Sequence, residues 1–509
     1  MPTRDSSVPS QTPLEVELKL IALHDPLVAF EEHVLPNLNG QVHVSKKTLK
    51  NQYFDTPEQL LRQHKMGLRV RSANDEHEQT LKLKGSTVGG LHQRPEYNLP
   101  LSTANVDIRL FDADIWPVTF DINGIQEALS PLFTTHFHRT TYHITDADDN
   151  EFEVVFDVGE VATDNDQHPI NEIELELVKG LPNALFELAN SIAQHCDVRV
   201  NNLTKAAYGY ALVSGKSLQP KKMAYVLPIN QKASTEAAFE TAAAYALKHW
   251  QHNQTVYVET YKLQALTEMV RAIRLLLQVF SLYLPVLQCK ALLSLHRDLI
   301  KFLQSLHWQD EIHAIRYLRS RKGPFSKRLN RDAALMSYLQ GRKEGILNAH
   351  APQDIIFSTA SATIQLDTAA LLLNRPWRES AHGYETPVIE HAHGWLSQGW
   401  QTLLQAMPNQ TMKAPQYLSA QVLLRQTLLN GFMLAGLFDE DRERFRAPWL
   451  DLAMGMEELN ALALLKHILQ ETDLDDKSDL LTWTRDKTDA LLNVMEMTRN
   501  VALNAEIYW

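Results

Sequence analysis

Residues 14–20 alternate apolar and charged side chains without exception, and no other pattern constrains the fold of this 509-residue chain as much. Because successive side chains of a strand point to opposite faces, Glu15, Glu17 and Lys19 share one face, and the leucines and the valine share the other. A row of three charges is typical either of a solvated edge strand or of the wall of a charged cavity. The side-chain patterns of the later strands distinguish between these two alternatives.

Seven further stretches of the first 215 residues have strand-like patterns: 42–54, 67–72, 80–84, 90–99, 137–145, 151–158 and 172–178. One strand with a charged face is usually solvated. The repetition of such faces favours instead a barrel closed with its charged side inward, and with helices, such as one over residues 182–194, on its apolar exterior. The residues that this arrangement turns inward are Lys19, Arg69, Arg71, Lys82, Lys84, Arg94 and Arg139, together with Glu15, Glu17, Asp157, Glu172, Glu174 and Glu176.

From about residue 220 the hydrophobic period becomes helical. Between residues 262 and 285 the apolar positions are spaced alternately by three and four, which is typical of a helix-bundle seam. We therefore expect an α+β protein. Its predicted parts are a disordered tail over residues 1–13, an antiparallel β domain over 14–215, a linker over 216–234 and an all-α bundle domain over 235–509.

Composition narrows the class of protein. The first 215 residues hold 17 Lys and Arg against 31 Asp and Glu, whereas the remainder has a net charge of +2. An acidic first domain argues against nucleic-acid binding there and suits a divalent cation. The chain has two cysteines, a polar N-terminus unlike a signal peptide, and no run of about 18 apolar residues. We expect a cytoplasmic protein with no membrane span.

The inward charges predict the chemistry of the ligand. Burying several like charges costs several kcal/mol for each unpaired ion, so neither the basic nor the acidic set is tolerable alone. A polyanion that also chelates a metal satisfies both sets, because Arg and Lys bind phosphoryl oxygens and carboxylates bind Mg²⁺ or Mn²⁺. Inorganic triphosphate and a nucleoside triphosphate are ligands of this kind.

Several motifs, in their order along the chain, resemble those of the CYTH family of triphosphate tunnel metalloenzymes. The similarity covers roughly residues 13–215 and is strongest to the bacterial inorganic triphosphatases, in part because of the stretch 89–98. The motifs are Glu15-x-Glu17-x-Lys19, residues 53–57 (YFDTP), Arg69-x-Arg71, Thr80-x-Lys82-x-Lys84, Arg94-x-Glu96, Arg139, Asp157-x-Gly159, Glu172-x-Glu174-x-Glu176 and Lys205.

This resemblance implies an eight-stranded antiparallel tunnel that hydrolyses inorganic triphosphate to pyrophosphate and phosphate with Mg²⁺ or Mn²⁺. It also implies roles for individual residues. Glu15, Glu17, Lys19 and Glu174 would be catalytic; Lys19, Arg69, Arg71, Lys82, Lys84, Arg94, Arg139 and Lys205 would bind substrate; and Glu15, Glu17, Asp157, Glu172, Glu174 and Glu176 would bind metal. Lys205 is expected on a helix that plugs one end of the tunnel, whereas Tyr53 and Phe54 are interpreted as packing residues.

The helical part resembles a CHAD domain, a kind of domain associated with polyphosphate binding. It keeps Arg271 and Arg274 of the CHAD pattern but has Gln264 and Thr267 where that pattern has its histidine and first arginine. Residues 316–331 include seven basic residues and no acid, which is either a solvated loop or an anion patch. Thiamine triphosphate hydrolysis, adenylate cyclase chemistry and a non-catalytic polyphosphate-binding scaffold remain alternative functions.

Overall fold

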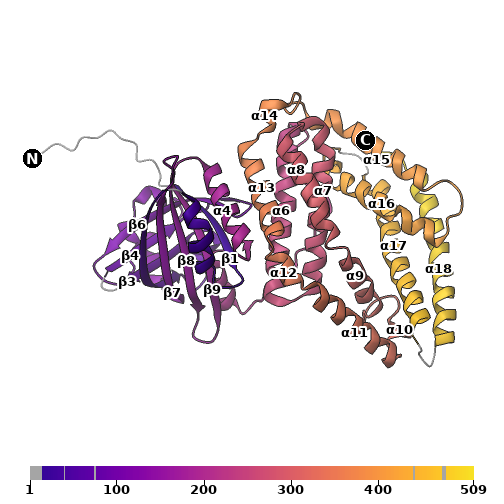
Figure 1. The fold of residues 1–509 in the computed structure, drawn as a ribbon, viewed down its shortest axis with the longest axis horizontal. Coiled ribbons are helices and arrows are strands. Elements are labelled where there is room, and N and C mark those ends of the chain that lie inside the picture. The colour runs from indigo at the N-terminus through magenta and orange to yellow at the C-terminus, as the bar shows by residue number, and fades with distance from the viewer. Residues whose placement is uncertain (1–13, 39, 74–75, 439–441, 473–476) are drawn as a thin grey trace, which may run out of the picture. The chain divides into compact units, whose positions relative to one another are not determined.

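The computed structural model describes residues 14–38, 40–73, 76–438, 442–472 and 477–509 (Figure 1). The predicted tail over residues 1–13 lies outside this range. The chain divides into two compact units. The barrel unit consists of Met1–Gln219, Val258–Tyr261 and Ile356–Asn374, and the helical unit consists of Pro220–Tyr257, Lys262–Ile355 and Arg375–Trp509.

The barrel unit is built on one antiparallel sheet. Its described strands are β1 (Leu14–Ala22), β2 (Gln41–Asp55), β3 (Gly67–Ala73), β4 (Glu76–Lys82), β5 (Ser86–Val88), β6 (Leu91–Leu101), β7 (Ser130–Thr145), β8 (Glu151–Ala162), β9 (Gln167–Lys179) and β10 (Val198–Val200). In the described residues, eight of them form a ring in the order β1-β9-β8-β7-β2-β3-β4-β6, which closes because β6 pairs with β1. The predicted closed eight-stranded tunnel is confirmed.

The strand register places the charged residues at similar heights along the ring. Across β1 and β9, Lys19 lies opposite Glu174 and Glu17 opposite Glu176. Across the closing pair of β1 and β6, Glu15 lies opposite Arg94. Since side chains directly opposite each other in a ladder share one face of the sheet, a single inward face collects charges from every strand that carries them.

Helices cover the apolar exterior of the barrel. They are α1 (Leu27–Ala29), a π-helical turn (Phe30–Val34), α2 (Leu60–Gln63), α3 (Ile122–Ala128), α4 (Pro182–His195) and α5 (Lys205–Ser214), with short 3₁₀ turns at Leu35–Leu38, Ile108–Leu110 and Ala113–Ile115. The helix α4 begins with a proline in its first turn and buries Leu185, Leu188 and Ile192. It packs against β9 and the π-helical turn (Figure 1). The opposite faces of β1 and β9 bury Leu18, Leu20, Ile173 and Leu175 completely.

The described part of the helical unit consists almost entirely of α-helices (Figure 1). They are α6 (Thr235–Thr260), α7 (Leu263–Leu287), α8 (Lys290–Gln304), α9 (Trp308–Leu318), α10 (Ser326–Leu329), α11 (Ala333–His350), α12 (Pro352–Ile356), α14 (Trp377–Ser380), α15 (Val388–Ala406), α16 (Ala414–Leu434), a 3₁₀ turn at Ala435–Leu437, α17 (Arg442–Glu471) and α18 (Lys477–Leu503). The predicted all-α second part is thus confirmed.

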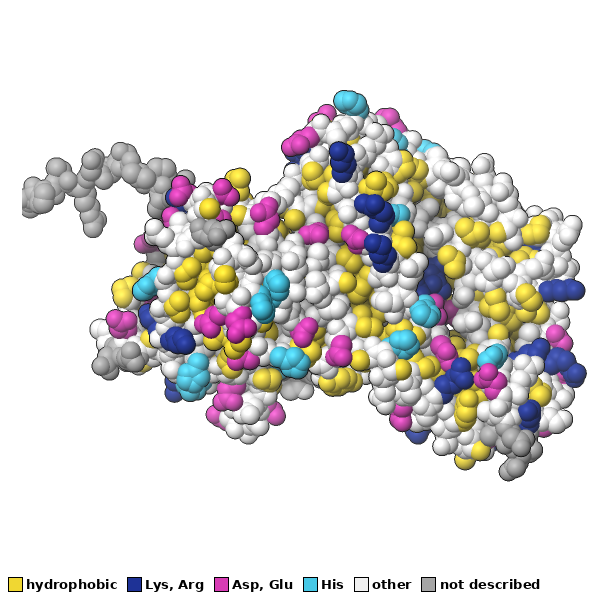
Figure 2. Space-filling model, viewed as in Figure 1, with side chains coloured by type: hydrophobic (Ala, Val, Ile, Leu, Met, Phe, Trp, Pro, Cys, Tyr) yellow, Lys and Arg dark blue, Asp and Glu magenta, His cyan; other side chains and the backbone are white. Residues whose placement is uncertain are grey.

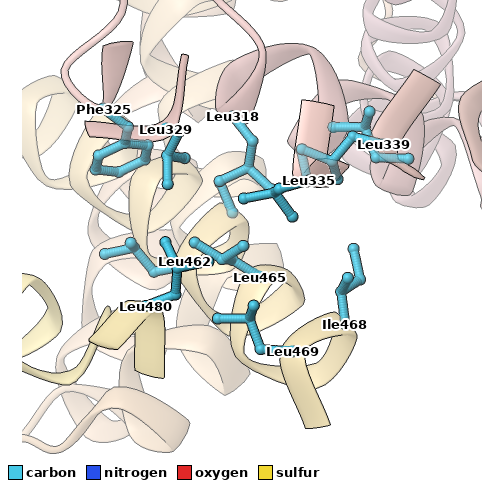
Figure 3. Packing of buried hydrophobic residues seen from close by; sticks show 13 residues of the cluster. Leu318, Phe325, Leu329, Leu335, Leu339, Leu462, Leu465, Ile468, Leu469 and Leu480 are labelled. Atoms are coloured by element: carbon cyan, nitrogen blue, oxygen red, sulfur yellow. The ribbon is translucent and has the colours of Figure 1, made fainter. Parts of the chain in front are cut away.

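One core of the helical unit joins segments that are distant in sequence. Leu318 of α9, Leu329 of α10 and Leu335 of α11 face Leu462 and Leu465 of α17 across a continuous apolar layer (Figure 3). Each of these leucines is at most 1% exposed. A fully buried leucine stabilises the folded state by about 2 kcal/mol, so this layer holds α9, α10 and α11 against α17.

Two segments that the predicted domain ranges placed in the helical bundle belong to the barrel unit. These are Val258–Tyr261, at the end of α6, and the helix α13 (Thr359–Asn374) with the residues just before it. The helix α13 packs on α4 and β10, and Asp367 accepts a 2.7 Å hydrogen bond from Asn190 of α4. Sequence periodicity predicts a helix but does not identify its packing partner, so it could not separate α13 from the bundle.

Two described segments, Leu263–Leu287 and Pro352–Asn374, have the length and apolarity of a membrane span. In the most apolar 18-residue stretch of each segment, 56% and 61% of the residues, respectively, are buried within the protein, as in the core helices of many folds. Length and composition are therefore only weak evidence for a membrane span here.

Candidate active site

The inner face of the barrel encloses a cavity of about 640 Å³. The carboxylates and cations of alternate strand positions line it, and the helix α5 contributes residues to one part of its wall. The predicted site residues that line the cavity are Glu15, Glu17, Lys19, Arg69, Arg71, Lys82, Arg94, Arg139, Glu174, Glu176 and Lys205.

The charged residues of β1 are held by ion pairs. Lys19 donates to Glu17 at 2.8 Å and also bonds Glu174, while Arg94 donates to the other oxygen of Glu17 at 2.5 Å. Glu17 and Lys19 are each 3% exposed. Burial acts to raise the pKa of Glu17, but the cations Lys19, Lys82 and Arg94 outweigh it and hold the pKa well below its ordinary value. Glu17 therefore remains a carboxylate throughout the physiological range.

A second set of pairs lies around Lys82. Its ammonium group lies 2.7 Å from Glu15 and 2.5 Å from Glu96, and Glu96 lies 3.6 Å from Arg69. Burial acts to raise the pKa of Glu96, but Lys82 and Arg69 lower it to about 2. By contrast, burial raises the pKa of Glu15 despite the presence of Lys82. Basic side chains of β3, β4 and β6 thus meet acids of β1 and β6 across the ring.

The helix α5 brings Lys205 to the tunnel. Thr204 caps the start of the helix by accepting a hydrogen bond from the backbone of Ala207. Lys205 lies 2.8 Å from Asp157, 2.5 Å from Glu172 and 3.0 Å from Glu174. These contacts anchor the first turn of the helix against β8 and β9.

Arg71 lacks a counterion. Its Nε donates to the side chain of Asn51 at 3.1 Å, and among the described residues it has no ion pair. Burial and the neighbouring guanidinium groups of Arg69 and Arg139 lower the pKa of Arg71 to about 9. This region of the cavity wall therefore holds positive charge that an anion would neutralise.

Glu176 is the acidic counterpart of Arg71. It lines the cavity and has no ion-pair partner in the described part of the chain. Burial and the negative charges of Glu15, Glu153 and Glu17 raise its pKa to about 7. The cavity thus has an unneutralised acidic region around Glu176 and an unneutralised basic region around Arg71.

Replacement of Glu176 by Gln is expected to flatten the pH dependence of stability in metal-free buffer. Because the pKa of Glu176 rises from 4.5 to about 7 on folding, the folded state binds the extra proton and stability is lost as the pH rises across that interval. Melting temperatures of wild type and Glu176→Gln measured at several pH values test this. Glu187→Gln, on the exposed side of α4, should follow the wild-type curve. An unchanged slope in Glu176→Gln would contradict the assignment.

The structure places three predicted residues outside the cavity lining. Lys84 is exposed, because β4 ends at Lys82 and the chain then turns toward β5 instead of continuing to residue 84 as predicted. The interpretation of Lys84 as an inward-facing residue is therefore wrong in this structure. Asp157 and Glu172 face inward but lie behind the lining, where they hold Lys205; Asp157 also accepts two hydrogen bonds from Arg139, at 2.7 and 2.6 Å.

Sequence reasoning gave no site role to several residues that line the cavity. Tyr53 combines two roles, because it stacks on Phe133 with ring centroids 4.6 Å apart and also borders the cavity. Glu96 and Glu153 have the inward strand parity, and that signal could have identified them. Arg62 lies on the short helix α2 and Lys65 just after it, and both side chains border the cavity. The segment is too short for side-chain periodicity to predict which way they point.

The cavity residues fit a hard divalent cation. The acids among them supply carboxylate oxygens, and behind this lining Oε1 of Glu172 is a further buried oxygen without a hydrogen-bond partner. In the described part of the chain, no three acidic, histidine or cysteine side chains are grouped as metal ligands. Most of the acids instead pair with Lys or Arg. Metal binding would thus require some of these ion pairs to rearrange.

Comparison with known proteins supports the class of the barrel unit. Residues 13–210 match the family model of the CYTH domain, so the predicted CYTH domain is confirmed. An inorganic triphosphatase from Haemophilus influenzae is 34% identical over 212 residues, which cover 40% of this chain and 56% of that relative. The chain therefore spans little more than half the length of this relative.

Similar solved structures cover each part of the chain. A candidate adenylyl cyclase from Hippeastrum, described as having a dominant triphosphatase activity, is 19% identical, with a TM-score of 0.30 over 40% of this chain and 96% of that one. The CHAD domain of Ricinus communis is 15% identical, with a TM-score of 0.45 over 57% of this chain and 98% of that one. At these values neither similarity assigns an activity, and membership of the helical unit in the CHAD family stays a prediction.

Proposed function

We propose that the barrel unit hydrolyses inorganic triphosphate to pyrophosphate and phosphate in a metal-dependent reaction. The observation that carries the proposal is the inner wall, where an unneutralised basic region and an unneutralised acidic region share one enclosed cavity. A simple anion-binding protein gains nothing from acids in its cavity. The 34% identity to an inorganic triphosphatase supports the choice of substrate.

The basic side chains would bind and orient the phosphoryl groups. Arg69, Arg71 and Arg139 come from neighbouring parts of the wall and present planar donors that match phosphoryl oxygens. Lys82 and Arg94 would exchange their present carboxylate partners for substrate oxygens. Phosphoryl transfer needs little covalent help from protein, so positioning and charge neutralisation would supply most of the rate.

The acidic side chains would hold the cation and the attacking water. Glu15, Glu17, Glu174 and Glu176 line the cavity and are the residues that would bind Mg²⁺ or Mn²⁺. When bound, such an ion supplies charge neutralisation to the phosphoryl oxygens. Carboxylates of the same set would also orient the attacking water.

Phosphate release from tripolyphosphate, pyrophosphate, ATP and thiamine triphosphate, with and without Mg²⁺ or Mn²⁺, tests this function. We expect tripolyphosphate to be the best substrate and a chelator to abolish turnover. Preference for thiamine triphosphate or for ATP would support one of the alternative chemistries in the same tunnel. The absence of metal-dependent turnover on all four compounds would overturn the enzyme proposal and leave a binding scaffold.

Lys82→Ala is expected to weaken tripolyphosphate binding by about tenfold or more, because one charge-assisted contact is lost. Titration calorimetry with the metal-free protein measures the change. Lys84→Ala is a matched control two residues along the chain, since Lys84 is exposed outside the cavity and its loss should leave the affinity unchanged. Equal losses of tripolyphosphate affinity in Lys82→Ala and Lys84→Ala would mean that the position of Lys82 in the cavity does not matter for binding.

Polyphosphate binding by the helical unit is proposed only for the basic segment 316–331. Arg321, Lys322 and Lys327 are exposed, whereas Arg328 is paired with Asp479. Because α13 packs within the barrel unit, a fragment beginning at Pro220 would remove its partners, and the full chain is the better reagent. Retention of the full chain on immobilised long-chain polyphosphate, lost in an Arg321→Gln/Lys322→Gln/Lys327→Gln variant, would support the proposal.

A further inference from the structure

The helical unit contains a second cavity, of about 400 Å³, between α7, α9, α16 and α17. The surface in Figure 2 is hollowed between α7 and α17, with Lys or Arg surface visible in the hollow. Four arginines line the cavity, together with Asp310 and Glu457. Two of these arginines, Arg425 and Arg446, belong to none of the basic motifs found in the sequence.

The two acids of this cavity are already engaged. Asp310 accepts hydrogen bonds from Arg274 at 2.8 and 2.9 Å. Glu457 lies 3.4 Å from Arg271 and 3.3 Å from His313. Neither acid forms a direct ion pair with the remaining two arginines.

Arg446 has donors that point to a ligand. It is only 3% exposed, and its Nη2 donates to the backbone oxygen of Tyr225 at 3.2 Å. Its Nε and Nη1 are buried without a hydrogen-bond partner. A buried donor without an acceptor is costly, so such a group in a cavity wall indicates that an acceptor binds there.

Arg425 has neither a hydrogen bond nor an ion pair within the described part of the chain. Burial and the nearby Arg274 lower its pKa to about 10. A second uncompensated guanidinium group thus lines the same cavity. Arg425 and Arg446 thus both present unused donors to this cavity.

Part of the remaining wall is apolar, and polar side chains such as Gln309, Gln421 and Asn460 complete it. Leu424, Leu428 and Phe432 come from α16, and Leu450 and Met456 from α17. A cavity of this size with an apolar wall and a few convergent polar groups is typical of a small-molecule site. A chain of phosphates carries charge along its whole length and would leave this apolar wall in contact with charged oxygens.

We propose that this cavity binds a compact amphipathic anion, with a carboxylate, sulfonate or phosphate group on Arg425 and Arg446 and an aliphatic or aromatic body against Leu428 and Phe432. Such a ligand satisfies the unused guanidinium donors and covers the apolar wall at the same time. The site is independent of the tunnel chemistry, so it does not rest on the proposed triphosphatase function.

The fluorescent probe 8-anilinonaphthalene-1-sulfonate, titrated into the full-length protein, tests the site. We expect Arg425→Gln to weaken probe binding by about tenfold, because one charge-assisted contact is lost. Leu428→Ala should weaken it without a change in charge. Arg485→Gln is the control, since Arg485 lies exposed on α18 and should have no effect. Melting curves should show Arg425→Gln at least as stable as wild type, because it relieves repulsion with Arg274.

Competition identifies the ligand class. The fluorescence that depends on Arg425 is expected to be displaced by phenyl phosphate or octanoate and to resist tripolyphosphate and long-chain polyphosphate at equal concentration. Displacement by polyphosphate alone would overturn the proposal in favour of a polyphosphate site. Probe binding equal in wild type and Arg425→Gln, or no binding at all, would also overturn it.

Discussion

Glu17→Gln is expected to reduce metal-dependent hydrolysis of tripolyphosphate by about a thousandfold while leaving tripolyphosphate binding in place. The substitution removes a negative charge from the cavity, and with it a predicted metal ligand, but keeps the size of the side chain. Glu17 is 3% exposed, and its two oxygens accept separately from Lys19 and Arg94, so Gln, which has a single acceptor oxygen, keeps one of these two contacts. Initial rates with saturating Mg²⁺ and calorimetric binding without metal measure the two effects separately.

The control for this experiment is Glu187→Gln, which makes the same chemical change on the exposed side of α4. It should retain wild-type rates. If Glu17→Gln turned over tripolyphosphate at a near-normal rate, Glu17 would not hold the metal. If it lost both binding and turnover, the substitution would have disturbed the phosphate-binding cations.

Lys205→Met is expected to destabilise the barrel unit by about 3 kcal/mol at neutral pH, because it leaves buried carboxylates without their cation. Lys205 contacts Asp157, Glu172 and Glu174. Asp157 keeps Arg139 as a partner, but Glu172 loses the only ion pair found for it in the described residues. Burial already raises the pKa of Glu172, so this carboxylate would take up a proton in the variant.

Denaturant unfolding of wild type and Lys205→Met at several pH values measures this effect. The stability deficit should shrink as the pH falls, since protonation of the abandoned carboxylate removes the buried charge. Lys216→Met, just beyond the end of α5 and exposed, is the control. A deficit independent of pH would show that lost packing, rather than unpaired charge, destabilises the variant.

Much of the barrel was predictable from local pattern. Glu15, Glu17 and Lys19 on β1, and Glu172, Glu174 and Glu176 on β9, alternate with apolar residues so regularly that only a two-sided strand accommodates them. Repetition of the pattern predicted a closed sheet with charge inside. The boundaries of β4 were less certain, because Lys84 continues the alternation in sequence although the strand has ended.

Other site features depend on contacts that no local pattern encodes. Tyr53 is an aromatic residue of the kind that usually packs in a core. Only its position opposite Arg69 in the sheet places it at the cavity. The second cavity brings together Arg274 of α7, Arg425 of α16 and Arg446 of α17, which are far apart in the chain. Each of them alone resembles an ordinary charge on a helix.

The sequence by itself determined the alternation of strands, the inward set of charges and the change from strands to helices near residue 220, because these follow from side-chain periodicity. The tertiary structure alone decided which charges are neutralised. Glu17 is held by Lys19 and Arg94, while Arg71 and Glu176 have no ion pair among the described residues. Charge compensation depends on distances of a few ångströms between strands, and those distances are set by register and ring closure, which the order of residues along one strand does not contain.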